Sequence, residues 1–392
     1  MRCSSRPLRA MTTGVAREVA MAIACAMLLL ALTVAPPSAR AQGIVALPSP
    51  TPSPALAPTP TLLPSPTPVP APTVINFDAS SGSTALNLGS NFLERLGDQA
   101  TSGLGAAQRS NPGGGGAPAA AEPLRVRTWG EVYGIAATTS AQGDFFGDKR
   151  KTWGGTAGVG ATLLPGVNLG LSVDQSRTDI DVPLALQSAT LDFTQFGFSA
   201  SVDRGPWTWA LALVRGIGNI NSMRDTGLGN ANAAYGAQSV GALTELSYYW
   251  TLDQSRIVPK AAVEYMRATT DAFQEMGGLN PDAVGGSTLE RSRALVGAEV
   301  GHYWIVDRKV FDLSAYGKFV DNFSQNASSV LVTLGPQAIS VQGIVESQYG
   351  ADAGASASLN LTNALRVYLN YDGKFRSNLQ SHQGTAGVEV RW

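Results

Sequence analysis

Cysteine is almost missing from this chain of 392 residues, which contains only Cys3 and Cys25. Both lie near the N-terminus, so the rest of the chain has no thiol for a disulfide framework, a Cys-ligated metal or a Cys nucleophile. Histidine is equally scarce, because His302 and His382 are the only two. The sequence shows no metal-ligand spacing and no glycine loop that opens a helix, so we expect no cofactor, and residues 113–116 (GGGG) are interpreted as a linker.

Charge is also sparse. Charged residues make up 15% of the chain, and 28 basic side chains face 29 acidic ones. No basic stripe is present, so nucleic-acid binding has no electrostatic basis, and no small-molecule substrate is evident. After the N-terminal region no apolar run is long enough for a membrane helix. The 43 glycines and the short alternating apolar runs indicate a β protein.

The N-terminal region has the features of a secretory signal peptide. Four arginines precede an apolar run from Ala20 to Val34, and the small residues Ala39 and Ala41 follow. We predict that residues 1–41 are read by the Sec export machinery and cleaved after Ala41. The alternative is a membrane anchor, which the shortness of the apolar run disfavours, because a spanning helix needs about 20 residues.

A proline-rich, low-complexity region follows at residues 42–83. Residues 48–73 read PSPTPSPALAPTPTLLPSPTPVPAPT, with proline at nearly every second position. Such a stretch can form neither a helix nor a sheet ladder, so we interpret the region as an extended linker or a residual passenger. Binding to a proline-recognising domain is the alternative.

Residues 84–122 are predicted to form a short helix and a Gly-rich linker. Leu88, Phe92, Leu93 and Leu96 fall near helical spacing, and Thr84 is a candidate first residue. A helix this short is unstable alone in water, so it needs a surface to pack against.

From residue 123 to 392 the pattern changes to period two. Leu365, Val367 and Leu369, for example, alternate with Arg366, Tyr368 and Asn370. We predict twelve strands, near residues 124–138, 151–163, 166–176, 189–202, 206–216, 235–251, 256–269, 290–305, 309–320, 345–360, 364–373 and 383–392.

The connections between these strands identify the class of β protein. Every second strand is followed by a tight turn such as Leu164-Pro165 or Asp307-Arg308, and the others by long polar loops such as 271–286. Short periplasmic turns alternating with long external loops are typical of outer-membrane barrels. We therefore predict a 12-stranded antiparallel up-and-down barrel in outer-membrane lipid, with the helix inside its lumen.

Aromatic and charged residues fit this arrangement. Tryptophans fall at the short-turn ends and are predicted to form an interfacial belt: Trp207, Trp209, Trp250, Trp304 and Trp392. Ten charged residues alternate onto the inner face, where they must be paired or hydrated: Glu245, Lys260, Glu264, Arg291, Arg293, Glu299, Lys318, Arg366, Glu389 and Arg391. His302 alternates onto the lipid face, and we place His382 in the last external loop.

The last part of the chain resembles the translocator domain of bacterial autotransporters (type V secretion). The resemblance is carried by residues 293–304, 311–324, 349–361, 365–375 and 384–392, and it ends on Trp392. It implies that Val388, Val390 and Trp392 form a C-terminal signal for the barrel-assembly machinery. It also implies a helix threaded through the barrel just before the first strand, for which a barrel of this size has room.

The resemblance has two departures. Autotransporters usually carry a long passenger ahead of the barrel, whereas only residues 42–83 stand there. Some members cut the passenger off inside the barrel at an Asn-Asn pair, and Ser90 stands where the cyclising Asn would be, before Asn91. We therefore expect no such cleavage and no enzymatic activity. The predicted function is an anchor that carries a short extension to the cell surface, and the alternative is a plugged, porin-like barrel with a periplasmic tether.

Overall fold

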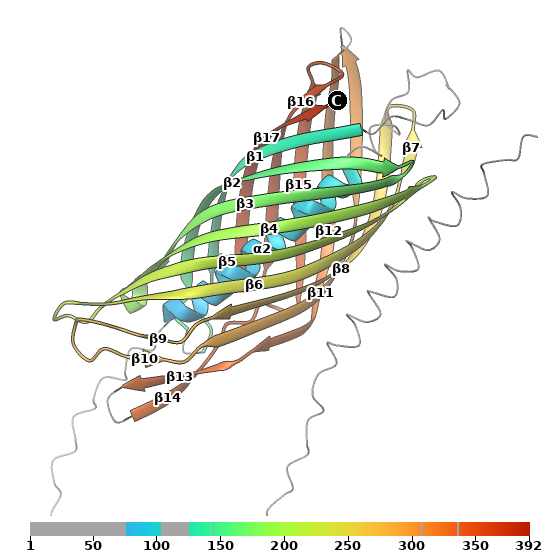
Figure 1. The fold of residues 1–392 in the computed structure, drawn as a ribbon. Coiled ribbons are helices and arrows are strands. Elements are labelled where there is room, and N and C mark those ends of the chain that lie inside the picture. The colour runs from blue at the N-terminus through green and yellow to red at the C-terminus, as the bar shows by residue number, and fades with distance from the viewer. Residues whose placement is uncertain (1–75, 103–124, 144, 307–308, 335–336) are drawn as a thin grey trace, which may run out of the picture. The chain divides into compact units, whose positions relative to one another are not determined.

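The computed structural model describes residues 76–102, 125–143, 145–306, 309–334 and 337–392. They form a barrel with a helix along its interior (Figure 1). The predicted signal peptide and the proline stretch lie outside the described residues. No helix in the described ranges is long and apolar enough to cross a membrane.

The elements follow one another around the barrel. They are α2 (Asn76–Ser102), β1 (Arg125–Thr139), β2 (Asp148–Leu164), β3 (Val167–Val182), η1 (Pro183–Ala185), β4 (Gln187–Arg204), β5 (Trp207–Asp225), β6 (Asn230–Tyr248), β7 (Trp250–Leu252), β8 (Ser255–Thr270), β9 (Phe273–Gln274), β10 (Ala283–Val284), β11 (Ser287–Val306), β12 (Lys309–Ala327), β13 (Ser329–Leu334), β14 (Gln337–Gln342), β15 (Tyr349–Asn360), β16 (Leu365–Arg376) and β17 (Leu379–Arg391).

The barrel wall consists of twelve antiparallel strands. Each wall strand pairs with its neighbour in the order β1-β2-β3-β4-β5-β6-β8-β11-β12-β15-β16-β17, and the three-residue β7 pairs with β8 beyond the end of β6. β17 pairs back onto β1 from Arg127↔Arg391 to Thr139↔Leu379, which closes the barrel and leaves no open edge in the wall. The predicted 12-stranded barrel is confirmed.

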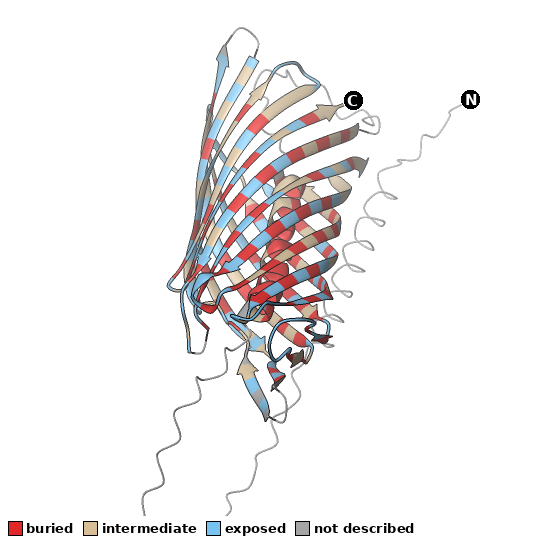
Figure 2. Cartoon of the chain, turned by 90° about the vertical axis from the view of Figure 1, so that its left-hand side faces the viewer, coloured by how far each residue is buried: buried red, intermediate tan, exposed pale blue. Residues whose placement is uncertain are grey.

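The wall separates an apolar outside from a polar inside. Large apolar side chains such as Val132, Leu171 and Leu369 are more than 60% exposed on the outside. The residues between them are buried, so burial alternates along each strand (Figure 2). This alternation follows from the pleat, which sends successive side chains to opposite faces, and it exposes the apolar set to lipid.

The two ends of the barrel differ. The short turns contain backbone with positive φ, at Gly166 and Gly205 for example, because two-residue turns need that conformation. At the other end the strands continue far beyond the ~10 residues that cross a bilayer, with 19 in β5 and β6 and 20 in β11. The strand predicted near residues 166–176 is therefore longer than expected, since β3 runs on to Val182.

A second, four-stranded sheet lies at the long-loop end, in the order β14-β13-β10-β9 (Figure 1). Our prediction placed the segments that form it in the connections between the wall strands. The pairing partners are far apart in sequence, as in Ala283↔Thr333, so local pattern gave no sign of them.

The helix begins at Asn76 and not at the predicted Thr84. Residues between these positions are mostly small, and Ser80 and Ser81 are fully buried, so the helix continues where a narrow lumen admits only small side chains. Thr84 is no cap, since its hydroxyl donates to the Ser80 carbonyl 2.6 Å away inside the helix. The helix spans the position of the domain boundary predicted between residues 83 and 84.

We predict that Gly197→Val on β4 displaces the helix. A Cβ at Gly197 would lie 2.5 Å from Leu96 Cδ1 and 2.9 Å from Phe92 Cζ. Overpacking of this kind costs about 1–3 kcal/mol, so amide exchange in residues 76–102 should accelerate while exchange in the wall is unchanged. Gly317→Val is the matched control, because Gly317 is on the outside and a Cβ there would meet nothing within 4 Å. Equal exchange in the two variants would contradict the prediction.

Candidate functional site

The candidate site is the lumen with α2 in it. The helix packs its apolar residues against one half of the wall: Leu88, Phe92, Leu93 and Leu96 are at most 4% exposed. Phe92 and Leu96 lie against Gly197 of β4, and Leu93 lies near Gly241 of β6. Glycines in these strands let the helix approach closely on this side, so the four residues predicted for the helix lie in its packed seam.

The opposite side of the helix is charged, and Glu94 is its centre. Its carboxylate lies 2.5 Å from the guanidinium of Arg293 on β11 and 2.5 Å from Nζ of Lys374 on β16. Nζ of Lys318 on β12 is 3.8 Å away. One helical carboxylate thus binds three cations that come from three different strands of the wall.

Arg95 makes the corresponding contacts with the start of the barrel. Its guanidinium is 3.4 Å from Asp174 on β3 and 3.7 Å from Glu131 on β1, and it stacks 3.9 Å from the ring centre of Tyr133. Further along the helix, Nζ of Lys260 on β8 lies 3.4 Å from Asp98. The helix therefore has charged partners around the circumference of the lumen.

Ser90 is part of the same network. Its hydroxyl donates to Glu264 Oε1 over 2.7 Å and accepts from Arg293 Nη2 over 2.5 Å. Glu264 and Arg293 are at most 1% exposed, so this hydroxyl satisfies a buried ion pair. At the position that the resemblance assigns to a cyclising Asn, the side chain has no amide nitrogen and is held in place by the wall.

The ten charged wall residues predicted to face the lumen are all ion-paired there. Glu389, for instance, is 1% exposed and lies near Arg127, Arg366 and Arg391. Their partners include Glu94 and Asp98 of the helix, whose role the sequence analysis missed. The charged residues in the segment LERLGDQ could have indicated this role, since charged residues on a helix inside a barrel need partners on the wall.

A polar cavity of about 140 Å³ remains between the helix and the strands opposite its apolar seam. Among its lining residues are Glu94, Asp98, Lys260, Glu299, Lys318 and Asp372. The space is large enough for several water molecules and is lined by groups that water can bind. The lumen is therefore packed on one side and polar on the other.

The tryptophans predicted for the belt lie at the short-turn end. Trp207, Trp250, Trp304 and Trp392 are 41–65% exposed on the outside of the isolated chain. Trp209 is half-buried, and its indole donates to the Thr244 hydroxyl over 2.8 Å. Their contact with a lipid interface stays a prediction.

Neither histidine has the surroundings of a catalytic base. His302 Nδ1 lies 2.8 Å from the Ser255 hydroxyl, but in the described part of the chain no carboxylate orients the ring. His382 is on β17 and not in a loop as predicted, because that strand begins at Leu379; it bonds the Tyr371 hydroxyl on the exposed face. No group of three potential metal ligands occurs among the described residues.

The outer end holds a separate charged cluster. Arg224 at the end of β5 pairs with Glu275, 2.5 Å away, and with Asp282, 3.1 Å away. Burial raises the pKa of Asp282 to about 6, although Arg224 opposes this effect. The cluster ties the β9–β10 connection to the barrel wall.

We predict that Glu94→Ala strongly weakens the binding of α2 to the wall of the lumen. Removing it takes the carboxylate partner from Lys374 and one of two carboxylate partners from Arg293, which keeps Glu264 at 2.8 Å, and breaking a buried pair costs about 3–5 kcal/mol. Amide exchange in residues 76–102 should accelerate accordingly.

Asp192→Ala is the control for this prediction. It removes a partner of Arg177 at 3.4 Å, where the two side chains are 41% and 48% exposed. An exposed pair contributes about 0–1 kcal/mol, so this change should leave the helix as it is. If both variants exchange like the parent, the helix does not depend on Glu94.

Comparison with known proteins agrees with this geometry. A family model described as "Autotransporter beta-domain" matches residues 128–372. An extracellular serine protease of Serratia marcescens is 20% identical over 278 residues, which cover 67% of this chain and 26% of that protein. The chain thus spans about a quarter of this relative.

A solved translocator domain shares the fold, and a second solved structure is reported beside it. The translocator domain of the autotransporter NalP from Neisseria meningitidis is 16% identical, with a TM-score of 0.61 over 81% of this chain and all of that one. The β-domain of the Bordetella autotransporter BrkA is 14% identical, with a TM-score of 0.49 over 68% of this chain and 98% of that one.

Proposed function

Because this chain belongs to the autotransporter β-domain family, we propose that its barrel carries the residues ahead of Asn76 to the cell surface and keeps them anchored there. The barrel itself is an outer-membrane translocator of a Gram-negative bacterium. The proposal concerns the destination of the N-terminal extension and the fate of the helix.

The direction of the helix in the barrel supports this destination. At its last turn the Thr101 carbonyl accepts a hydrogen bond of 2.8 Å from Tyr249, which lies at the short-turn end. At its first turn Asp78 accepts a bond of 3.2 Å from Thr270, at the long-loop end. This direction supports an exit of the preceding chain through the long-loop mouth, which is external in barrels of this kind.

The network around the helix favours the hypothesis of an anchor and disfavours that of an open channel. Glu94, Arg95 and Asp98 connect the helix to strands around the wall, and its apolar seam is fully packed. A periplasmic tether would require the extension to lie at the opposite end. We also propose that the barrel catalyses no reaction and that the helix stays uncleaved, since Ser90 has no amide nitrogen to cyclise.

We expect a peptide tag inserted at Ala46, just ahead of the proline run, to be accessible on intact cells. It should be stained and removed by added protease, and it should remain with the cells. A tag found in the medium would show that the chain is cut, and a tag reached only after the outer membrane is broken would refute surface delivery. A tag in the external loop at Gly227 is a positive control for accessibility.

We also propose that the Sec machinery reads residues 1–41 and that the barrel-assembly machinery reads the end of β17. Val388, Val390 and Trp392 lie on one face of the C-terminal end, and Trp392 is 65% exposed. The backbone of Trp392 is bonded to Val126 at the closing seam, so it also lies where the barrel must finally join.

We predict that Trp392→Ala lowers the amount of assembled barrel in outer-membrane fractions several-fold. Trp250→Ala is the control, because Trp250 is also exposed at the short-turn end but is not at the C-terminus. Equal losses in the two variants would point to a general role of interfacial tryptophans in place of a C-terminal signal.

A further inference from the structure

Two arginines interrupt the apolar outer face of the barrel wall. Arg215 on β5 and Arg267 on β8 point outward, and both are exposed. Along β5 the neighbours of Arg215 on this face are Leu213 and Ile217, which are 39% and 49% exposed. A charge on the lipid face is costly in the middle of a bilayer and costs little at its boundary, so the level of these arginines decides what they can contact.

Arg215 lies near the outer boundary of the apolar band. It stands eight positions beyond Trp207, with which β5 begins at the short-turn end. A rise of about 3.3 Å per residue and a strand tilt of about 40° place it about 20 Å above Trp207, in a band about 25 Å tall. Asn219 and Asn221 follow on the same face and are exposed, so the band ends just beyond Arg215.

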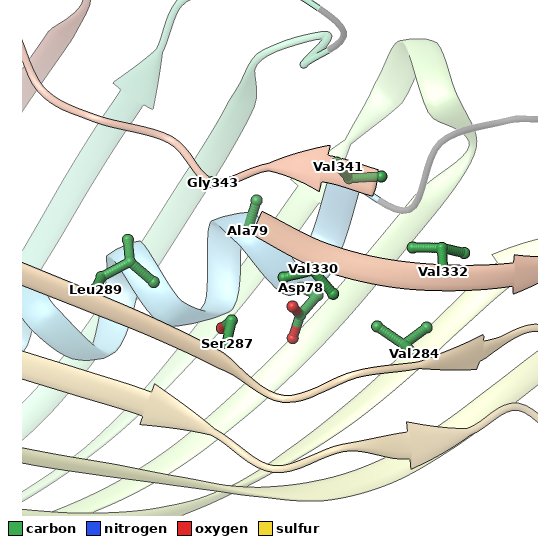
Figure 3. A pocket seen from close by; sticks show the side chains of 9 residues that line it. All are labelled: Asp78, Ala79, Val284, Ser287, Leu289, Val330, Val332, Val341 and Gly343. Carbon is green, nitrogen blue, oxygen red and sulfur yellow. The ribbon is translucent and has the colours of Figure 1, made fainter. Parts of the chain in front are cut away.

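Arg267 reaches a similar level. It stands ten positions beyond Ile257, which pairs with a tryptophan of the short-turn end, and the same geometry places it about 25 Å above that end. Three positions further along β8, Thr270 lies opposite Ser287. Ser287 lines the same small cavity as Asp78 of the first helical turn (Figure 3). Arg267 is therefore just below the long-loop mouth.

The two arginines are neighbours across β6. Val240 lies directly opposite Arg215 on one side and Arg267 on the other. Residues directly opposite each other share a face, and the spacing of three adjacent strands puts the Cα atoms of the two arginines about 10 Å apart. The short side chain of Val240 does not separate two long guanidinium side chains, so both can bind one ligand.

The protein satisfies these two cations only in part. Arg215 Nη2 donates to the Gln238 amide oxygen over 2.6 Å, and this partner carries no charge. Glu290 lies 3.6 Å from Nε of Arg267, and the two side chains are 34% and 48% exposed, so this pair is weak. Among the described residues no acceptor binds Nη1 of Arg215 or either Nη of Arg267. These are the nitrogens with which arginine recognises phosphate.

Basic residues elsewhere on the outer face have acidic neighbours. Lys151 on β2 lies opposite Asp179. Arg177 on β3 lies 3.4 Å from Asp192. Arg215, in contrast, has the apolar residues Phe196 and Val240 directly opposite it. The excess of positive charge is therefore local to β5 and β8.

The far half of the wall presents aromatic rings towards its long-loop end. Phe319 stacks on Tyr349 with 5.9 Å between ring centroids, and the Tyr371 hydroxyl lies 2.7 Å from His382 Nδ1. Such rings suit the boundary between acyl chains and headgroups without selecting a charge. Only the half with β5 and β8 thus combines an apolar surface with paired arginines above it.

We propose that Arg215 and Arg267 bind the phosphate groups of a phosphorylated lipid in the outer leaflet. Its acyl chains lie on the apolar surface below the arginines, where Leu213 and Val263 are 39% and 50% exposed. A free phosphate ion would use the same nitrogens but would gain nothing from this surface. The inference requires the barrel to lie in the outer membrane, and it is independent of the proposed delivery of the N-terminal extension.

The test is native mass spectrometry of the full mature chain in detergent micelles, titrated with diphosphoryl lipid A. The parent should retain bound lipid. Arg215→Gln/Arg267→Gln should raise the dissociation constant about tenfold, because it removes charge-assisted hydrogen bonds to phosphate. Arg215→Lys/Arg267→Lys keeps both charges and should recover most of the affinity.

The matched control is Lys151→Gln/Arg177→Gln, which removes the same charge from the outer face of β2 and β3 and should bind lipid like the parent. Four results would overturn the proposal: a parent that binds no lipid, equal loss in the two glutamine variants, a lysine variant no better than its glutamine counterpart, or equal binding of dephosphorylated lipid A.

Inorganic phosphate distinguishes the two sources of the anion. Without lipid it should not bind the parent. Phosphate binding that Arg215→Gln/Arg267→Gln abolishes would assign the arginines to a free ion and would also overturn the proposal. The tag at Ala46 reports surface delivery alone, so either hypothesis can fail while the other stands.

Discussion

The contact of Glu94 with Arg293, Lys318 and Lys374 is the interaction on which the position of the helix depends. The four residues come from one helix and three strands, so a single carboxylate connects the helix to three strands of the wall. In a low-dielectric interior such charges are costly when unpaired, and each excludes alternative positions of the others. The helix is thereby fixed in rotation as well as in depth, which the small and apolar residues on its other face could not achieve alone.

The lumen is asymmetric because one half packs closely against the helix and the other half is lined by charged residues around a cavity. On the side of β4 and β6, glycines remove side-chain volume and let Phe92, Leu93 and Leu96 pack closely. On the side of β8, β11, β12 and β16 the wall keeps long charged side chains and a cavity of about 140 Å³. A lumen with only apolar residues would have no favourable way to hold water when the helix is absent. A lumen lined by paired charges is stable both when hydrated and when filled, which suits a wall through which a chain must pass before it closes.

The sequence predicted the wall well because lipid imposes a simple rule on it. Every wall strand has to present apolar residues outward at period two, and short and long connections have to alternate, so local patterns near Leu171 or Leu369 were sufficient. The same reasoning placed Arg293 and Glu389 inside. It failed where structure depends on residues distant in sequence. The outer sheet joins residues near 283 to residues near 333, and the helix start at Asn76 depends on the space left by the surrounding strands.

The partners of the predicted lumenal charges show the same limit. The alternation of residues predicts that Arg293 points into the lumen. It cannot predict the contacts of Arg293 with Ser90, Glu94 and Glu264, because the tertiary fold places the helix and the strand that carry these residues. A helix with acidic and basic residues on one side is solvated in an ordinary soluble protein. Inside a closed barrel the wall replaces the solvent, so the same side chains become the contacts that hold the helix. The helix runs with Thr101 near the short turns and Asp78 near the long loops, and this direction supports the proposed exit of the preceding chain at the long-loop end. The closed wall gives the chain no lateral exit, because β17 is hydrogen-bonded to β1 along the whole seam. Seam closure and helix direction are therefore the two features on which the proposed surface delivery of the N-terminal extension rests.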